Sequence, residues 1–257
     1  MLYQTVTLQR VNHVMVVTIN YPMNDKGGMA RLSDELAELS TEAAWDEEVR
    51  VIIITGAGEK SFSMEGCLNG EISGTNEEQE IKFLSLAESI AKLDRPVIAA
   101  IHGDAIGQGL ELALACDIRV AAETSRFGLP HIRKGLIPWD GGTQRLSRMV
   151  GRGKALEMIL TGETIDVQEA LRMGLVNRVV PAGELMKVVM EIAQEIASRG
   201  PIAIRYAKEA IYKGMDMTLE QGLHLEAGLY LLLHTTEDRT KGIQAFREKK
   251  ASPFEGR

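Results

Sequence analysis

The chain has 257 residues, of which 45% are apolar and 25% are charged, as is usual for a folded globular protein. Its formal net charge of −7 argues against nucleic acid as the main partner, because a surface that follows phosphates needs a basic excess. The longest apolar runs, such as residues 51–54, are far shorter than the ~20 residues of a membrane-spanning helix, so we expect no membrane partner.

The cysteine content and the first residues bear on the compartment. Two cysteines, Cys67 and Cys116, make no disulfide framework, which fits a reducing environment. The opening Met-Leu-Tyr-Gln-Thr lacks the charged and apolar regions of a signal peptide and the arginine-rich character of a transit peptide. These features predict a cytoplasmic protein.

The first part of the chain alternates strand and helix patterns. β-Branched runs on either side of Asn12 and His13 predict a hairpin, and a later apolar run predicts a strand buried on both faces. Thr75 stands three residues before Glu78, which is the spacing of a capping box at a helix start. The predicted elements are strands over residues 5–11, 14–20 and 50–55, and helices over residues 29–44 and from this box to about residue 93.

The most informative stretch is a strand, a glycine turn and a helix. Residues 96–102 are short and apolar enough for a buried strand, and Gly107 and Gly109 then open an apolar helix. Such a turn directs backbone N–H groups and the positive end of the helix dipole at whatever lies over it. Glu111 follows Gln108 by three residues and shares its helix face.

A carboxylate beside N–H donors suits chemistry in which a carbonyl gains charge while a proton moves. The alternative is that the glycines only allow close packing and that Glu111 faces solvent, as most glutamates do.

Helices dominate the second half of the chain. A strand at residues 118–122, an extended piece at 126–131 and a loop at 135–142 precede them. From Gly153 onward we expect only one extended segment, residues 177–181, and a helix capped by Asp166 with Glu169 three residues later. Helices at residues 183–198, 201–213 and 218–234 are too apolar to stand alone, so we expect them to pack on the core or on another subunit.

These pieces, in this order, resemble the crotonase superfamily, the enoyl-CoA hydratase/isomerase family, over nearly the whole chain. The similar segments are residues 62–68, 95–103, 107–117, 127–130, 135–138 with 141–146, 160–163, 174–177 with 180–181, and 245–249. The resemblance implies an α/β fold, a ClpP-like spiral of β-β-α units over residues 1–195, and a helical C-terminal region over residues 196–257 that packs on the core or on a neighbouring subunit. It also implies homotrimers or hexamers built as dimers of trimers, and an acyl-CoA thioester as substrate. Coenzyme A then enters with the substrate, and no other cofactor and no metal is expected.

The resemblance also assigns the reacting groups. It places the thioester carbonyl between the backbone N–H groups of Gly66 and Gln108, an oxyanion hole that stabilises an enolate. Gln108 replaces the middle glycine of the family's turn; its backbone can still donate, and its side chain narrows the pocket. Glu111 matches the first of two acid/base glutamates of the hydratases. The second should follow the proline of Phe127-Gly-Leu-Pro130, but His131 stands there, which either relays the proton as an imidazole or marks a different reaction.

Other positions depart from the family's pattern or match its substrate-binding residues. Glu65 stands where glycine is common, and Asp140 follows Trp139 where the loop is usually small and apolar; both candidates lie either in the pocket or at its rim. Phe246 and Lys249 match positions that hold the adenine and phosphate region of CoA in relatives. The full set of predicted substrate-binding residues is Lys26, Met64, Cys67, Leu68, Trp139, Phe246 and Lys249.

The sequence therefore predicts a lyase of the enoyl-CoA hydratase type, with Glu111 as principal base and His131 as its partner. It would add water to an α,β-unsaturated acyl-CoA, and a conjugated or cyclic dienoyl-CoA is one candidate. Three alternatives stay open: an acyl-CoA hydrolase acting on the thioester or on a C–C bond, an enoyl-CoA isomerase, and an acyl-CoA-binding protein without turnover.

Overall fold

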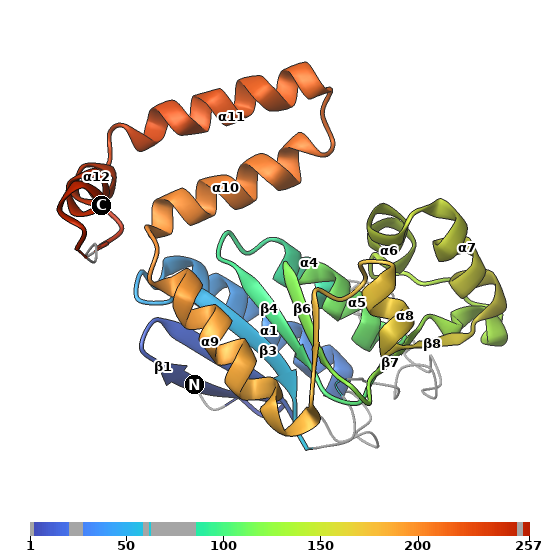
Figure 1. The fold of residues 1–257 in the computed structure, drawn as a ribbon. Coiled ribbons are helices and arrows are strands. Elements are labelled where there is room, and N and C mark those ends of the chain that lie inside the picture. Colours follow the sequence, from blue (N-terminus) through green and yellow to red (C-terminus); the bar gives the residue numbers. More distant parts are fainter. Residues whose placement is uncertain (1–2, 21–27, 59–61, 63–85, 251–253) are drawn as a thin grey trace.

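A six-stranded sheet forms the centre of the molecule (Figure 1). The computed structural model describes residues 3–20, 28–58, 62, 86–250 and 254–257. The strand order is β1-β2-β3-β4-β6-β9. β1 and β2 pair antiparallel as the predicted hairpin, and every other neighbouring pair of this sheet is parallel. The strands are β1 (Val6–Val11), β2 (Val14–Ile19), β3 (Val51–Gly56), β4 (Val97–Ile101), β6 (Ile118–Ala122) and β9 (Arg178–Val180).

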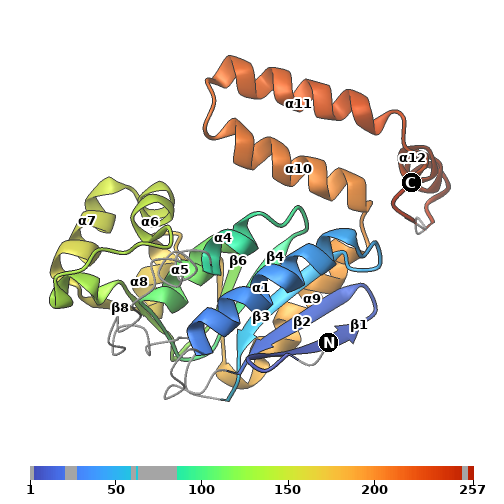
Figure 2. The ribbon, with the colours of Figure 1, turned by 180° about the vertical axis from the view of Figure 1, so that it is seen from behind.

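Helices cover both faces of this sheet, as Figures 1 and 2 show from opposite sides. On β3, Ile52 and Ile54 face a core shared with α1 (Gly28–Trp45), whereas Ile53 faces a second core shared with α9 (Leu185–Ala197). Side chains alternate between the faces of a strand, so a continuous run of isoleucines is what two covered faces require. The expected buried strand at residues 50–55 is confirmed.

A smaller sheet lies beside the first, in the order β5-β7-β8. β7 (Arg126–Gly128) pairs parallel with β5 (Asp104–Ile106) and antiparallel with β8 (Thr164–Asp166). The expectation of a single extended segment after Gly153 was therefore wrong. β8 has three residues, which are too few to show an alternation of apolar and polar side chains. Its pairing with β7 determines its conformation.

The expected extended piece at residues 126–131 was also wrong at its end. The strand stops at Gly128, and Pro130 begins a 3-10 helix, η1 (Pro130–Lys134). Proline is favoured at the first helical position because its fixed φ suits a helix and its missing N–H would have no partner there. This turn of helix carries His131.

Short helices lie between and around the two sheets. The prediction that Asp166 caps a helix is confirmed, since its carboxylate accepts the N–H of Glu169. The helices of this region are α4 (Leu86–Ala91), α5 (Gln108–Ala115), α6 (Gly142–Val150), α7 (Arg152–Thr161) and α8 (Val167–Arg172). Every residue of α5 is buried, so this helix is part of the core.

The last three helices extend away from the sheet (Figures 1 and 2). After η2 (Ala182–Glu184) and α9 come α10 (Pro201–Gly214), α11 (Leu219–Leu233) and α12 (Glu237–Glu248). α10 and α11 pack on each other, with Gly222 close to Gly214. The division into a core of residues 1–195 and a helical region of residues 196–257 stays a prediction. No helix within the described ranges has the length and apolar character that crossing a membrane requires.

Polar contacts attach these helices to the core. Lys208 on α10 donates from Nζ to the Asp117 carboxylate and to the Arg95 carbonyl, both at 2.8 Å. Arg50 donates to the carbonyls of Ala197 and Phe254, which ties the end of the chain to the start of β3. Lys208 is mostly shielded from solvent, so its contacts should contribute more than those of a surface ion pair.

We expect Lys208→Met to lower the free energy of unfolding by about 2 kcal/mol, because the variant loses two hydrogen bonds that a charged group makes in a partly buried place. Chemical denaturation followed by circular dichroism measures this change. Lys213→Met is the matched control, since Lys213 lies on the same helix and pairs with Glu209 at the surface. Equal effects of the two substitutions would contradict an anchoring role for Lys208.

Candidate active site

The N-terminus of α5 is held open by a glycine turn. Gly107 has φ 62° and ψ −129°, in the left-handed half of backbone space that favours glycine. Its N–H donates to the Gly128 carbonyl at 2.9 Å, which ties this turn to β7. No side chain caps the helix. The first N–H groups of a helix have no acceptor within the helix, and Gln108 is the first residue of α5.

Glu111 lies one turn further along α5 and is completely buried. Its Oε1 accepts the N–H groups of Asp140 and Gly142, at 2.8 and 3.0 Å. A Cβ on Gly142 would come within 2.9 Å of that oxygen, so only glycine allows this approach. Burial raises the pKa of Glu111 to about 7, although its two backbone hydrogen bonds oppose the shift. The alternative that Glu111 faces solvent is wrong.

His131 faces this carboxyl from η1. Its Nε2 lies 3.7 Å from Glu111 Oε2, close for an ion pair but too far for a hydrogen bond. The imidazole is fully buried and meets the Trp139 ring edge to face, with centroids 5.1 Å apart. Burial lowers the pKa of His131 to about 4, and the Leu129 backbone opposes that shift. The ring is therefore neutral in its resting state at neutral pH.

Several polar atoms at this place have no hydrogen-bond partner among the described residues. They are Glu111 Oε2, both ring nitrogens of His131, and the side-chain oxygen and nitrogen of Gln108. Buried polar groups are nearly always paired, so a cluster of unpaired ones needs an explanation. A substrate or a water molecule that supplies donors and acceptors would provide it.

Asp140 lies in the interior of the site and not at its rim, with 4% of its surface exposed. Its Oδ2 accepts the Ala87 N–H at 2.7 Å, near the start of α4. Burial raises the pKa of Asp140 to about 7, and the nearby Glu111 charge adds to this. Arg145 opposes both shifts; its Nη1 donates to the Asp140 carbonyl, and its guanidinium lies against Gly141.

The structure thus brings Gln108, Glu111, His131, Trp139 and Asp140 together. It does not bring Phe246 and Lys249 to them, because α12 lies far from α5 in space (Figure 1). The remaining predicted site residues, Lys26, Met64, Glu65, Gly66, Cys67 and Leu68, lie outside the described residues. Arg145 was missed as a site residue, although its place four residues after Gly141, at the start of a helix, was a usable signal.

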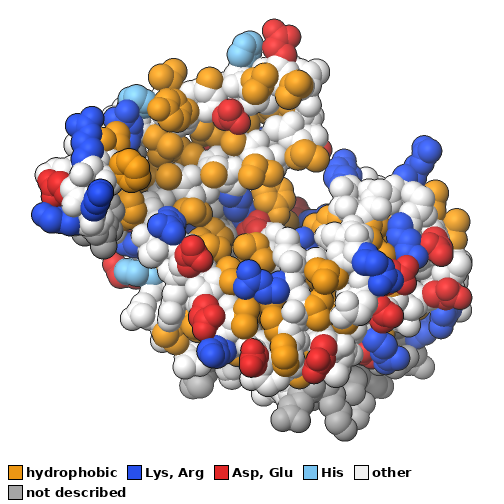
Figure 3. Space-filling view, viewed as in Figure 1, with side chains coloured by type: hydrophobic (Ala, Val, Ile, Leu, Met, Phe, Trp, Pro, Cys, Tyr) orange, Lys and Arg blue, Asp and Glu red, His pale blue; other side chains and the backbone are white. Residues whose placement is uncertain are grey.

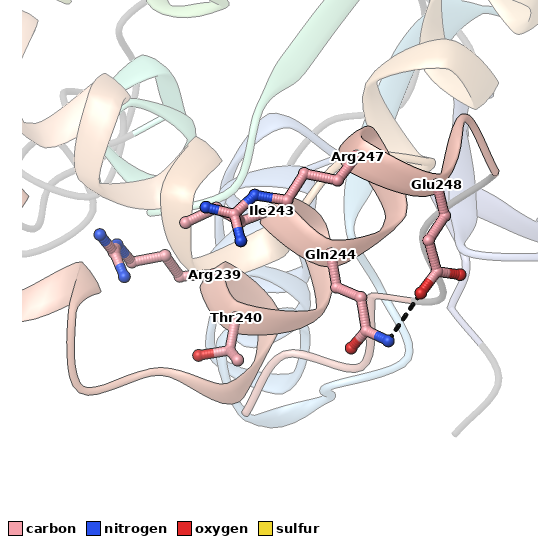
Figure 4. A pocket seen from close by; sticks show the side chains of 6 residues that line it. All are labelled: Arg239, Thr240, Ile243, Gln244, Arg247 and Glu248. Atoms are coloured by element: carbon pink, nitrogen blue, oxygen red, sulfur yellow. Dashed lines mark hydrogen bonds between the residues drawn. The ribbon is translucent and has the colours of Figure 1, made fainter.

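A pocket of about 390 Å³ lies on the surface of α12 (Figure 4). Its lining residues are Arg239, Thr240, Ile243, Gln244, Arg247 and Glu248. Guanidinium groups bind phosphates well, and the neighbouring Phe246 is 85% exposed, so this surface can offer a charged and a stacking contact together. Within the described ranges, no group of three or more His, Cys, Asp or Glu side chains is placed to hold a metal ion.

The raised pKa of Glu111 makes stability depend on pH. An unperturbed glutamate titrates near 4.5, so between that value and about 7 the folded protein keeps a proton that the unfolded chain has lost, and stability falls as pH rises through this window. Glu111→Gln keeps an oxygen for the two backbone N–H groups and removes the titration. We expect the free energy of unfolding of Glu111→Gln, measured relative to that of the wild type, to rise by about 2–3 kcal/mol between about pH 5 and about pH 8.

Thermal and chemical unfolding across this range measure the change. Glu47→Gln, the same substitution at an exposed position, is the control. A gain that is the same at both ends of the range would contradict the burial of a titrating carboxyl at position 111.

The chain is similar in sequence and in fold to known proteins. The sequence model of the enoyl-CoA hydratase/isomerase family matches residues 9–257. The chain is 42% identical over 252 residues to a short-chain-enoyl-CoA hydratase of Clostridium acetobutylicum, covering 95% of each chain. It is 38% identical over 257 residues to an (E)-benzylidenesuccinyl-CoA hydratase of Thauera aromatica, covering 98% of this chain and 99% of that protein.

A solved structure of similar fold is the enoyl-CoA hydratase from Bacillus anthracis, with a TM-score of 0.88 and 40% identity over 99% of this chain and 100% of that one. The α/β crotonase fold expected from the sequence is confirmed by this match. A family model that spans nearly the whole chain, relatives of full length and a shared fold lead to one conclusion: the chain belongs to the enoyl-CoA hydratase/isomerase family.

Proposed function

We propose that this protein is an enoyl-CoA hydratase, a lyase that adds water across the double bond of an α,β-unsaturated acyl-CoA. The observation that carries the proposal is the buried Glu111 carboxyl, with a pKa raised to about 7, facing a neutral His131 beside an uncapped helix N-terminus. The full-length similarity to named enoyl-CoA hydratases supports it. Coenzyme A is part of the substrate, and the addition of water calls for no other cofactor.

In this mechanism the thioester oxygen accepts hydrogen bonds from the backbone N–H groups of Gln108 and Gly66. The role of Gly66 stays a prediction. Hydrogen-bond donors aimed at this oxygen stabilise the enolate, and losing one such donor typically costs about 10²–10³ in rate. The helix dipole of α5 adds a favourable field, because the negative charge develops at its positive end.

Glu111 moves the protons. Its ionised Oε2 and the His131 Nε2 lie 3.7 Å apart, so one attacking water can contact both atoms from one side. As the water oxygen bonds to the β carbon, Glu111 takes its proton and the π electrons move onto the thioester oxygen. The enolate then returns its electrons to form the C–H bond at the α carbon, with the proton from Glu111. A pKa near neutrality lets one carboxyl both accept and return that proton.

The hydrolase alternative is less well supported. A hydrolase would use His131 with Asp140 or Glu65 to activate water. The Asp140 carboxylate, however, accepts a hydrogen bond from the Ala87 N–H. The carboxyl that lies close to the His131 ring is that of Glu111. Isomerisation on the same base and binding without turnover give different products and are separated by the panel described below. The cytoplasmic location stays a prediction from the cysteine content.

We also propose that the protein assembles as a homotrimer, alone or paired into a hexamer. Hydrophobic side chains gather on the outer surface of α10, α11 and the turn between them (Figure 3). We call these residues the α10–α11 apolar face: Ile211, Tyr212, Met215, Met217, Leu219, Leu223, Tyr230, Leu231 and Leu232. So many large apolar side chains in one exposed area are typical of a surface that another protein covers.

The position of α12 also supports an assembly with further copies of this chain. Phe246 and Lys249 are expected to hold the adenine and phosphates of CoA, but α12 is distant from α5 of its own chain (Figure 1). In an assembly, the same helix can approach the site of the next subunit. The proposal thus accounts for both an uncovered apolar face and a CoA surface that its own site does not use.

Replacing Leu223 and Leu231 together by glutamate should dissociate the assembly into single chains, because it buries charge at the interface. Size-exclusion chromatography with light scattering measures the mass. Leu8→Glu, at an exposed position on β1, is the control. A wild-type protein that is already monomeric at micromolar concentration would contradict the trimer.

Substitution of the acid/base pair tests the chemistry. We expect Glu111→Gln to lower kcat by about 10³-fold while acyl-CoA affinity changes little, because the variant keeps its hydrogen bonds and loses proton transfer. His131→Ala should cost about ten-fold and shift the pH profile of kcat. Near-normal turnover by Glu111→Gln would falsify its role as base, and an unaltered pH profile would remove His131 from the mechanism.

A panel of acyl-CoA thioesters followed by mass spectrometry identifies the reaction. Hydration adds the mass of one water, isomerisation leaves the mass unchanged but moves the double bond, and hydrolysis releases free CoA. Binding with none of these changes would identify a binding protein.

A further inference from the structure

The side-chain amide of Gln108 has no role in the mechanism above, which uses only the backbone N–H of this residue. The side chain is buried, with 2% of the residue exposed, and neither its oxygen nor its nitrogen has a hydrogen-bond partner within the described part of the chain. A buried amide without partners is costly, and a hydrophobic side chain of the same length would avoid that cost. The amide is therefore expected to meet a polar group of the ligand.

The place of Gln108 in α5 favours a group on the acyl part of the substrate. Gln108 is the first residue of α5, and Glu111 lies three residues later on the same helix face. Side chains of a helix lean towards its N-terminus, so the amide extends from the end where the thioester oxygen is proposed to bind. The unpaired Glu111 Oε2 and His131 nitrogens account for the attacking water, which leaves the amide for another oxygen.

The charges around the site indicate that the ligand group that meets the Gln108 amide is uncharged. Glu111 and Asp140 are two buried carboxyls, His131 is neutral, and Arg145 already donates to the Asp140 carbonyl. A further carboxylate here would be repelled and would lose its hydration. A primary amide offers both a donor and an acceptor, and a hydroxyl, which is also both, is its simplest neutral match.

We propose that the preferred substrate of this site is an enoyl-CoA that carries a hydroxyl close to the double bond, and that the Gln108 side chain hydrogen-bonds this hydroxyl. The inference rests on the proposed hydratase function and adds the class of acyl group. Gln108 then has two separate contacts, one through its backbone to the thioester and one through its side chain to the acyl chain.

Three substrates test the proposal: crotonyl-CoA, its γ-hydroxy derivative and its γ-carboxy counterpart. We expect kcat/KM of the wild-type enzyme for the γ-hydroxy compound to exceed that for crotonyl-CoA by about 10- to 100-fold, because a site built to bond a hydroxyl discriminates against an analogue without it. The γ-carboxy compound should be the poorest of the three. Equal kcat/KM values for the first two, or a preference for the carboxylate, overturn the proposal.

Gln108→Met, which keeps the length of the side chain and the backbone N–H, should bring the ratio of the γ-hydroxy to the crotonyl value close to one. Gln194→Met, an exposed change on α9, is the matched control and should leave the ratio as in the wild type. An equal loss for both substrates in Gln108→Met would show that the amide serves the water or the fold, and would overturn the proposal.

The substrate ranking of the unmodified enzyme decides the matter even if Gln108→Met does not fold. Absence of hydration with all three compounds contradicts the proposed function itself, and the inference falls with it. Hydration of all three without preference leaves the function standing and removes only the role of the Gln108 side chain.

Discussion

The site depends on one carboxyl oxygen that is held and another that is left free. Glu111 Oε1 accepts two backbone N–H groups from the segment that begins α6, and this fixes the side chain between two helices. Oε2 has no partner in the described part of the chain and faces His131. Oε1 thus links α5 to the segment that begins α6, and Oε2 is the candidate acid/base atom. Each role uses a different oxygen of the same carboxyl.

This arrangement has an energetic consequence for the whole region. Three titratable side chains, those of Glu111, His131 and Asp140, are taken out of water with Arg145 beside them. Burial drives each towards its neutral form, raising the pKa of the two carboxyls and lowering that of the imidazole. Near neutral pH the carboxyls therefore change protonation state easily, which suits proton transfer and lowers stability.

Much of the fold could be predicted from the sequence because it depends on local patterns. β-Branched runs give β1, β2 and β3, and the spacing of Asp166 and Glu169 gives a capped helix. The glycine turn with Glu111 three residues after Gln108 gave the centre of the site. The features that depend on distant segments could not be predicted. β8 is a strand because of β7, and Asp140 is buried against Ala87, 53 residues away.

The hydrogen bond from Gly107 to Gly128 extends the pairing of β5 with β7 and holds two segments of the site together. One begins the helix that carries Gln108 and Glu111, and the other leads within three residues to His131. Gly128 itself is enclosed, since a Cβ there would meet the Thr164 side chain at 2.8 Å and the Glu163 carbonyl at 3.1 Å. A methyl group at this one position would displace both segments, and with them Glu111 and His131, although Gly128 itself takes no part in proton transfer.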